Sequence, residues 1–252
     1  MGIFGITITE YAALPDFLSP EELSALLLSI KVSVWSTLLS APLAIFTGWL
    51  LARKNFPGKG VFDALIHLPL VLPPVVPGYL LLLLFGRNGP FGRALDVCCG
   101  ITLGFSWKGA ALASALMAFP LMVRSVRLSV SLIDIRLESA ARTLGASALS
   151  VFFSITLPMA MPGIVSGLVL GFSRSLGEFG ATITFVGNIA GETRTLPLAI
   201  YTASQIPDGD MQAMRLITLS LIVALAALVG SEQLSRRMER KLGLGAGANA
   251  GA

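Results

Sequence analysis

The chain has 252 residues, of which 54% are apolar and only 13% are charged, and its formal net charge is +4. Its mean hydropathy is +0.81. An ordinary soluble domain carries about 25% charged residues and could not cover this much apolar surface. The composition therefore excludes a soluble globular protein and predicts an integral membrane protein.

Five apolar runs are long enough to cross a bilayer. A spanning helix needs about 20 mainly apolar residues, and the runs cover residues 23–51, 61–85, 107–130, 161–186 and 211–230. A shorter apolar stretch, 195–201, cannot cross, so we expect it to lie at the outer surface or to be re-entrant. The pattern predicts an all-α membrane protein with about five transmembrane helices.

The basic residues indicate the orientation. Most of the 18 Lys and Arg residues follow the first run, separate the third from the fourth, or follow the fifth. Five spans place these groups on one side, and the positive-inside rule makes that side cytosolic. We therefore expect an outer (periplasmic) segment over residues 1–22, a membrane domain over 23–235, and a disordered cytosolic tail over the Gly/Ala-rich residues 236–252.

The second run contains prolines near its middle, Pro73 and Pro74. Proline cannot continue a helix, and irregular backbone at this depth is tolerated only where protein or water covers it. Two interpretations remain open. The prolines make a kink against a neighbouring helix, or they mark a transport path.

The fourth run combines small residues with two charges. Gly163, Gly167 and Gly171 recur every four residues, which favours close helix packing. Arg174 and Glu178 follow with i,i+4 spacing, about 20 Å or more along a helix that begins near residue 161. A charge at that depth is either a structural ion pair or part of a path for an anion. The candidate path residues are Pro73, Pro74, Ser173, Arg174, Glu178 and Thr182.

The sequence lacks the patterns of the common catalytic and metal sites. It contains no G-x-x-x-x-G-K-[ST] phosphate loop and no cluster of Cys and His, and its carboxylates are scattered. Its basic residues mark a membrane side and not a nucleic-acid surface. We expect no catalytic residue, no metal site and no nucleic-acid partner. A membrane-embedded enzyme or scaffold would need a polar cluster within the spans, where only Arg174 and Glu178 qualify.

The loop between the third and fourth runs carries a specific motif. Gly145, Ile155, Leu157 and Pro158 form the pattern G-x9-I-x-L-P. This pattern resembles the EAA loop of type I ATP-binding-cassette importer permeases. The block SRSLGEFGATITFVGNIAGETRTLPLAIYT after it resembles most closely the bacterial molybdate permeases.

The resemblance implies that this loop, over residues 137–158, contains a short cytosolic helix that docks into an ATPase subunit. The coupling residues carried over are Glu138, Ser139, Ala140, Ala141, Gly145, Leu157 and Pro158. One position departs from the motif, because Ser139 stands where the family has glutamate, and Glu138 lies one residue earlier.

The implied function is import of molybdate across the bacterial inner membrane, with sulfate or tungstate as the alternative anion. The implied partners are cytosolic ATPase subunits, a periplasmic molybdate-binding protein, a second copy of this chain, and membrane lipid. ATP and Mg²⁺ would bind the ATPase partner, so no cofactor is expected on this chain.

Overall fold

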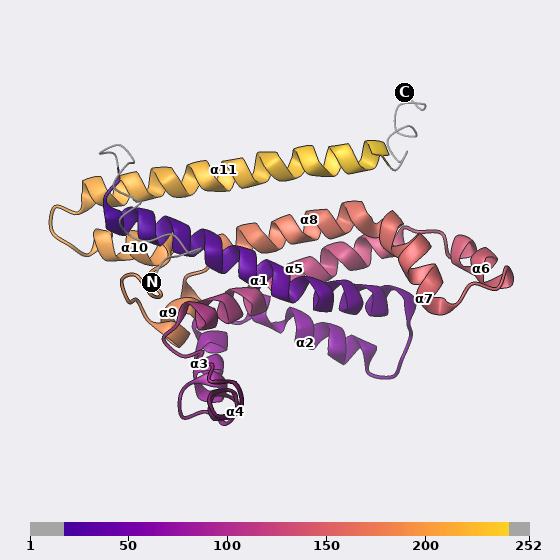
Figure 1. Cartoon of the computed structure of the whole chain (residues 1–252), viewed down its shortest axis with the longest axis horizontal. Coiled ribbons are helices and arrows are strands. Elements are labelled where there is room, and N and C mark those ends of the chain that lie inside the picture. The colour runs from indigo at the N-terminus through magenta and orange to yellow at the C-terminus, as the bar shows by residue number, and fades with distance from the viewer. Residues whose placement is uncertain (1–17, 242–252) are drawn as a thin grey trace.

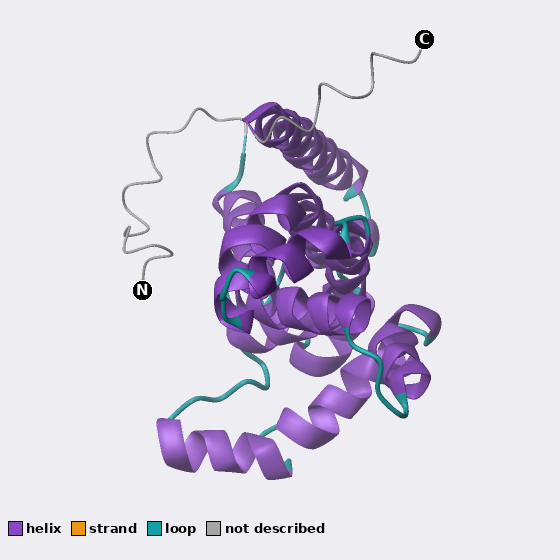
Figure 2. Ribbon diagram, turned by 90° about the vertical axis from the view of Figure 1, so that its right-hand side faces the viewer, coloured by secondary structure: helices purple, strands orange, loops and turns teal. Residues whose placement is uncertain are grey.

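The computed structural model describes residues 18–241, and this range folds into helices with no strand (Figures 1 and 2). The long helices are α1 (Pro20–Arg53), α5 (Trp107–Ser131), α8 (Leu157–Leu176) and α11 (Asp210–Lys241). The first shorter helices are α2 (Lys59–Val71), α3 (Val75–Phe85), α4 (Pro90–Cys99) and α6 (Ile135–Thr143). The others are α7 (Ala148–Val151), the π-helix η3 (Phe152–Thr156), α9 (Gly180–Val186) and α10 (Leu196–Ser204).

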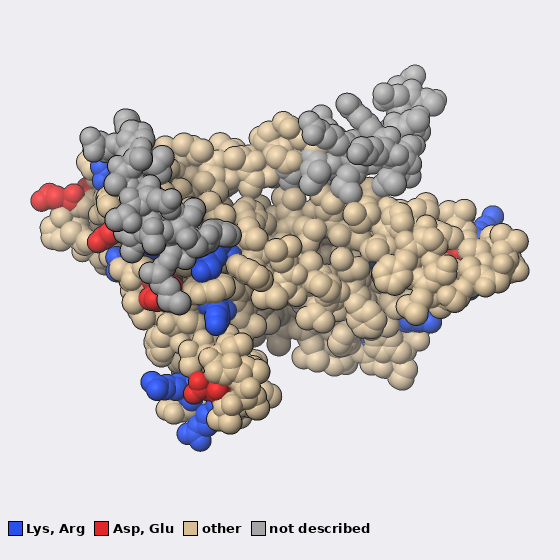
Figure 3. Space-filling view, viewed as in Figure 1, with Lys and Arg blue, Asp and Glu red and all other residues tan. Residues whose placement is uncertain are grey.

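Within the described residues, four helices are long and apolar enough to cross a membrane, and the bent pair of α2 and α3 makes a fifth candidate span. The predicted all-α membrane fold with about five spans is confirmed. In Figure 1 the C-terminal end of α1, helix α6 and the C-terminal end of α11 lie at the same end of the molecule. Charged residues gather toward the two ends of the face in Figure 3, with an uncharged band between them.

The second span is broken. α2 ends at Val71, α3 begins at Val75, and their axes meet at 109°. Pro73 and Pro74 occupy the break, where the missing N–H groups and the bulk of the rings prevent a continuous helix. The chain therefore turns sharply here, well beyond a simple kink.

The fourth span begins and ends earlier than the sequence predicted. The spanning helix runs from Ala148 to Leu176, and α9 is a separate helix after a break at residues 177–179. Arg174 therefore lies in the last turn of α8, directly before the break. Gly177 ends the helix, because glycine lowers helix stability at this point.

The core is built on α5, which packs between α1 and α8. At Gly163 an added Cβ would overlap the side chain of Ser129, so the glycines of α8 do provide close packing. The contact is also polar, since Ser125 Oγ donates to the Gly163 carbonyl over 2.8 Å. Ser129 Oγ donates to the Ala160 carbonyl over 3.3 Å.

The serines of α1 join distant parts of the chain. Ser36 Oγ donates to Ser175 Oγ on α8 over 2.8 Å. Ser29 Oγ accepts from the Leu196 N–H over 2.6 Å and so caps α10. Helix α10 covers the short stretch 195–201 and is not a candidate span.

Helix α11 is tied to the start of α1 by an ion pair. Arg215 donates through Nε and Nη2 to Glu22 Oε1, over 3.2 and 3.0 Å. The helix continues to Lys241, so residues 236–241 are helical and not part of a disordered tail, as the sequence had suggested. The rest of that tail (242–252) and most of the outer segment (1–17) lie outside the described residues.

Candidate functional site

Helix α6 has well-defined ends. Asp134 caps its start, because the Oδ1 atom accepts from the Arg136 N–H over 2.9 Å. At its end Gly145 has φ +88°. Its N–H bonds to the Arg142 carbonyl at 3.0 Å, and the Ala146 N–H bonds to the Ala141 carbonyl at 3.1 Å. These two bonds form a Schellman cap, which needs a left-handed residue and so favours glycine.

Helix α6 and the residues that follow it expose large apolar side chains beside polar ones. Leu144 is 88% exposed, and Ser139, Ala140 and Gly145 are exposed as well. The other exposed apolar residues on α6 and the neighbouring α7 and η3 are Ile135, Leu137, Leu149 and Phe153. Exposed apolar side chains gathered in one place indicate a contact surface for a partner.

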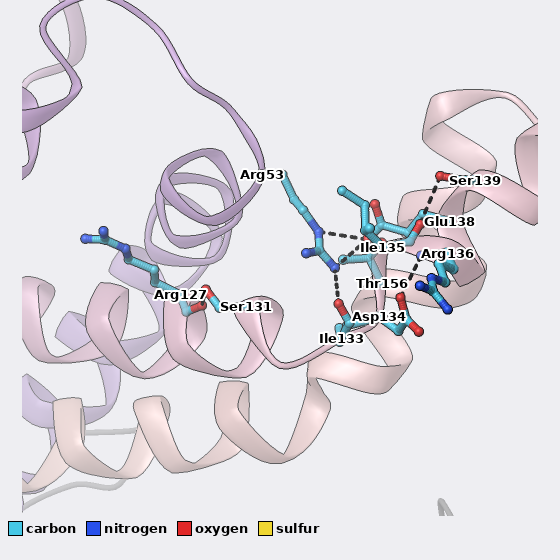
Figure 4. Close-up of polar contacts among 10 residues, drawn as sticks. All are labelled: Arg53, Arg127, Ser131, Ile133, Asp134, Ile135, Arg136, Glu138, Ser139 and Thr156. Atoms are coloured by element: carbon cyan, nitrogen blue, oxygen red, sulfur yellow. Dashed lines mark hydrogen bonds and ion pairs between the residues drawn. The ribbon is translucent and has the colours of Figure 1, made fainter.

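Glu138 points inward and is the one buried residue among the nine of α6, all of which the structure describes. Its Oε1 atom accepts from Arg53 Nε at 3.0 Å and from Thr156 Oγ1 at 2.9 Å, and it forms an ion pair with Arg53 Nη2 at 2.9 Å (Figure 4). Arg53 Nη2 also donates to the Ile133 carbonyl over 3.0 Å. Glu138 therefore does not stand in for the glutamate missing at Ser139, because it is not exposed to a partner.

Sequence reasoning missed the part that Arg53, Ile133 and Thr156 play here. Arg53 precedes Glu138 by 85 residues, and in the sequence it stood out only as one of several basic residues that mark the cytosolic side. No spacing in the sequence connects the two side chains. The contact exists because the end of α1 and the turn between α5 and α6 lie at the same end of the bundle (Figure 1).

Leu157 and Pro158 lie in the first turn of α8, directly after η3, and both are partly buried. Pro158 has no N–H to offer to the preceding turn. The Leu157 N–H reaches back to the Phe152 carbonyl, a π-type bond. Leu157 packs on the cluster that includes Val126 and Ile133. These two residues thus shape the entry into α8 and are not part of the exposed surface of α6.

The breaks in the second and fourth spans lie against each other. A Cβ added to Gly180, at the start of α9, would lie 2.6 Å from the Cβ of Pro74. Arg174 Nη1 lies 2.6 Å from Glu178 Oε2, so the predicted i,i+4 ion pair forms. Glu178 Oε1 accepts from the Ala181 N–H over 2.9 Å and caps α9. The structure thus pairs Arg174 with Glu178 and places Pro74 against Gly180, two residues after Glu178.

The remaining candidate path residues lie on α8, on α9 and in the break between α2 and α3, and they are not part of the ion pair between Arg174 and Glu178. Thr182 is buried on α9, and its hydroxyl forms no hydrogen bond in the described residues. Ser173 is partly buried on α8, next in sequence to Arg174. Pro73 is exposed in the break between α2 and α3. A path role for these residues remains a prediction.

The ion pair between Arg174 and Glu178 gives a testable order of stabilities. We expect Arg174→Gln alone to lower the free energy of unfolding by about 3 kcal/mol, because it leaves the buried Glu178 carboxylate without its cation. The double variant R174Q/E178Q removes both charges and should be more stable than the single one. Thermal unfolding in detergent measures the order, and anion uptake by the double variant measures the path role. Wild-type uptake by that variant would make the pair purely structural.

The chain matches the family model described as "Binding-protein-dependent transport system inner membrane component" over residues 42–239. It is 61% identical over 224 residues to the molybdenum transport system permease protein of Haemophilus influenzae. The aligned stretch covers 89% of this chain and 98% of the relative. The corresponding protein of Escherichia coli is 55% identical, over 90% of this chain and 99% of the relative.

A sulfate transport system permease protein of Salmonella typhimurium is 33% identical, over 89% of this chain and 80% of the relative. Among solved structures, the MetNI methionine ABC transporter in inward-facing conformations matches with a TM-score of 0.66 and 16% identity, over 86% of this chain and 95% of that chain. That likeness concerns the fold, and it agrees with the helical bundle described above. The chain belongs to the family of binding-protein-dependent transport system inner membrane components.

Proposed function

We propose that this chain is the permease subunit of an ATP-binding-cassette importer that carries molybdate across the inner membrane. The observation that carries the proposal is the 61% identity to a molybdenum transport permease, which extends over 98% of that relative. In this proposal a periplasmic binding protein delivers the anion. Separate ATPase subunits bind ATP and Mg²⁺, so the chain itself needs no cofactor and performs no catalysis.

The surface of α6 supports docking of an ATPase subunit. The helix is short, capped at both ends, and exposes leucines to water at the same end of the molecule as the end of α1. The small residues Ser139, Ala140 and Gly145 leave room for a partner to approach the backbone. A Cβ at Gly145 would meet no atom of this chain within 4 Å.

A second copy of the chain would complete the path. Helix α2 has no buried residue, and it exposes Val61, Leu65 and Leu68. Such a surface suits lipid or a protein partner. A path between two copies would also cover the irregular backbone between α2 and α3, which cannot face lipid directly.

Molybdate is favoured over sulfate by the difference in similarity. The sulfate permease relative is 33% identical, whereas the two molybdenum permeases are 61% and 55% identical. Tungstate has the same charge and tetrahedral shape as molybdate, so similarity alone does not separate these two anions.

The test is uptake by proteoliposomes that hold the complete complex of this chain with its ATPase subunits and its binding protein. We expect ATP-dependent uptake of molybdate, with tungstate competing and a large excess of sulfate without effect. Complexes in which the ATPase subunits cannot hydrolyse ATP serve as the control. Sulfate uptake at a comparable rate would overturn the molybdate assignment, and absence of any anion uptake would overturn the transport function.

A further inference from the structure

Helix α6 is attached to the membrane domain by a polar contact and not by an apolar core. Its buried residue is Glu138, while Ile135 and Leu137 are exposed. At both ends the chain leaves α6 through short turns, over residues 132–134 and 144–147. Besides these turns, Glu138 makes the hydrogen bonds that join α6 to α1 and to η3, and α6 also lies against α7 and η3.

The hydrogen bonds between α6 and the neighbouring helices meet at one carboxylate oxygen, Oε1 of Glu138. Glu138 Oε1 accepts from Arg53 and from Thr156, and Arg53 holds the Ile133 carbonyl at the turn before α6. The side chains of Arg53 and Glu138 are 10% and 6% exposed. Thr156 is buried as well. A buried ion pair costs desolvation and is retained only with good geometry and further hydrogen bonds, both of which are present.

The two donors and the carbonyl that Arg53 bonds belong to different parts of the bundle. Arg53 is in the last turn of α1, and its positive charge also suits the negative end of that helix dipole. Thr156 is the last residue of η3, immediately before α8. Ile133 follows α5. Glu138 thus joins α6 directly to α1 and to η3 ahead of α8, and Arg53 extends the connection to the end of α5 (Figure 4).

We propose that Glu138 is a positioning residue that transmits the displacement of α6 into α1 and α8, with Arg53 and Thr156 as its receiving groups. The inference rests on the proposed function, because it concerns how ATP hydrolysis on the partner drives the permease. In this inference Glu138 does not touch the ATPase subunit and acts on the inner side of α6. The ATPase would touch the exposed residues of α6, and Glu138 would carry the force inward.

The main test is Glu138→Ala in the complete complex, with molybdate uptake and ATP hydrolysis measured in the same vesicles. We expect the ATPase subunits to co-purify as with the wild type and to keep hydrolysing ATP. The ratio of anion imported to ATP hydrolysed should fall by about tenfold, an effect of the order seen for residues that couple distant sites. Glu138→Gln should keep most of the ratio, because its amide oxygen can accept the same hydrogen bonds.

Ser131→Ala is the matched control, because Ser131 is the last residue of α5, is exposed, and its Oγ donates to the Arg127 carbonyl of the same helix. It should leave the ratio unchanged. If Glu138→Ala does not insert into the membrane, Thr156→Val carries the test, since it removes one donor and keeps the shape. A wild-type ratio in both Glu138→Ala and Thr156→Val overturns the proposal. Loss of ATPase co-purification in Glu138→Ala also overturns it, since that result would place Glu138 at the docking surface.

A second measurement separates this inference from the proposed function. A nitroxide spin label at position 139, with the exposed Cys98 and Cys99 changed to serine, reports the mobility of α6 whatever anion is carried. We expect the label to become more mobile when Glu138→Ala is added, even if the transported anion is not molybdate. Unchanged mobility would show that Glu138 does not anchor α6.

Discussion

Replacing Gly145 by leucine is expected to lower ATP-driven uptake by about tenfold or more, since changes at residues that couple two sites alter the coupling by up to about 2 kcal/mol. Gly145 has φ +88°, a conformation that costs an L-residue about 1–2 kcal/mol. The leucine would break the cap of α6 and would also project into the open space that a partner could occupy. Uptake and ATPase co-purification with the complete complex measure the effect.

Gly191→Leu is the control for backbone strain. Gly191 has φ +78° and also has no atom within 4 Å of an added Cβ, but it lies between α9 and α10, at the other end of the bundle from α6. The two substitutions therefore carry the same kind of local cost. Equal loss of uptake in both variants would mean that strain alone explains the result, and docking at Gly145 would be refuted.

Replacing Gly163 by leucine is expected to force α5 and α8 apart and so to destabilise the protein. An added Cβ already overlaps Ser129, and the carbonyl of Ser125 lies 3.2 Å away. Forcing extra atoms into a packed contact lowers the free energy of unfolding by about 1–3 kcal/mol. Because a whole leucine side chain would meet backbone atoms here, we expect a loss at or above the upper end of that range. We expect a large drop in the melting temperature of the detergent-solubilised protein, with loss of uptake as a consequence.

Gly230→Leu provides the comparison, because an added Cβ there meets no atom within 4 Å. Leucine is also the better helix former, by up to about 1 kcal/mol. The melting temperature should therefore stay the same or rise slightly. A Gly163→Leu variant as stable as Gly230→Leu would contradict the close approach of α5 and α8.

The features that depend on local chemistry could be predicted from the sequence. Apolar runs predicted the spans, and Pro73 and Pro74 predicted the break between α2 and α3. The spacing of Gly163, Gly167 and Gly171 predicted a packing face, which the structure places against α5. In each case a few neighbouring residues determine the result, through the length of a span, a missing N–H or a missing side chain.

The boundary of the fourth span was wrong because hydropathy does not detect a helix end within an apolar stretch. Residues 161–186 form one mainly apolar stretch, in which Arg174 and Glu178 are the charged residues. Its division into α8 and α9 depends on the Glu178 cap and on the packing of Gly180 against Pro74. The contact between Arg53 and Glu138 joins residues 85 apart, and the Ser36–Ser175 bond joins residues 139 apart. Pairings of this kind depend on the tertiary arrangement, which no local pattern contains.

The exposed leucines of α6, of the turn after it and of α7 have a consequence for biosynthesis. A soluble segment that exposes Leu137, Leu144 and Leu149 is an aggregation liability until a partner covers it. A permease made in excess of its ATPase subunits would therefore keep this apolar surface uncovered in the cytosol. Chaperones and proteases act on such surfaces. Balanced synthesis of the two subunits thus protects the permease as well as completing the transporter.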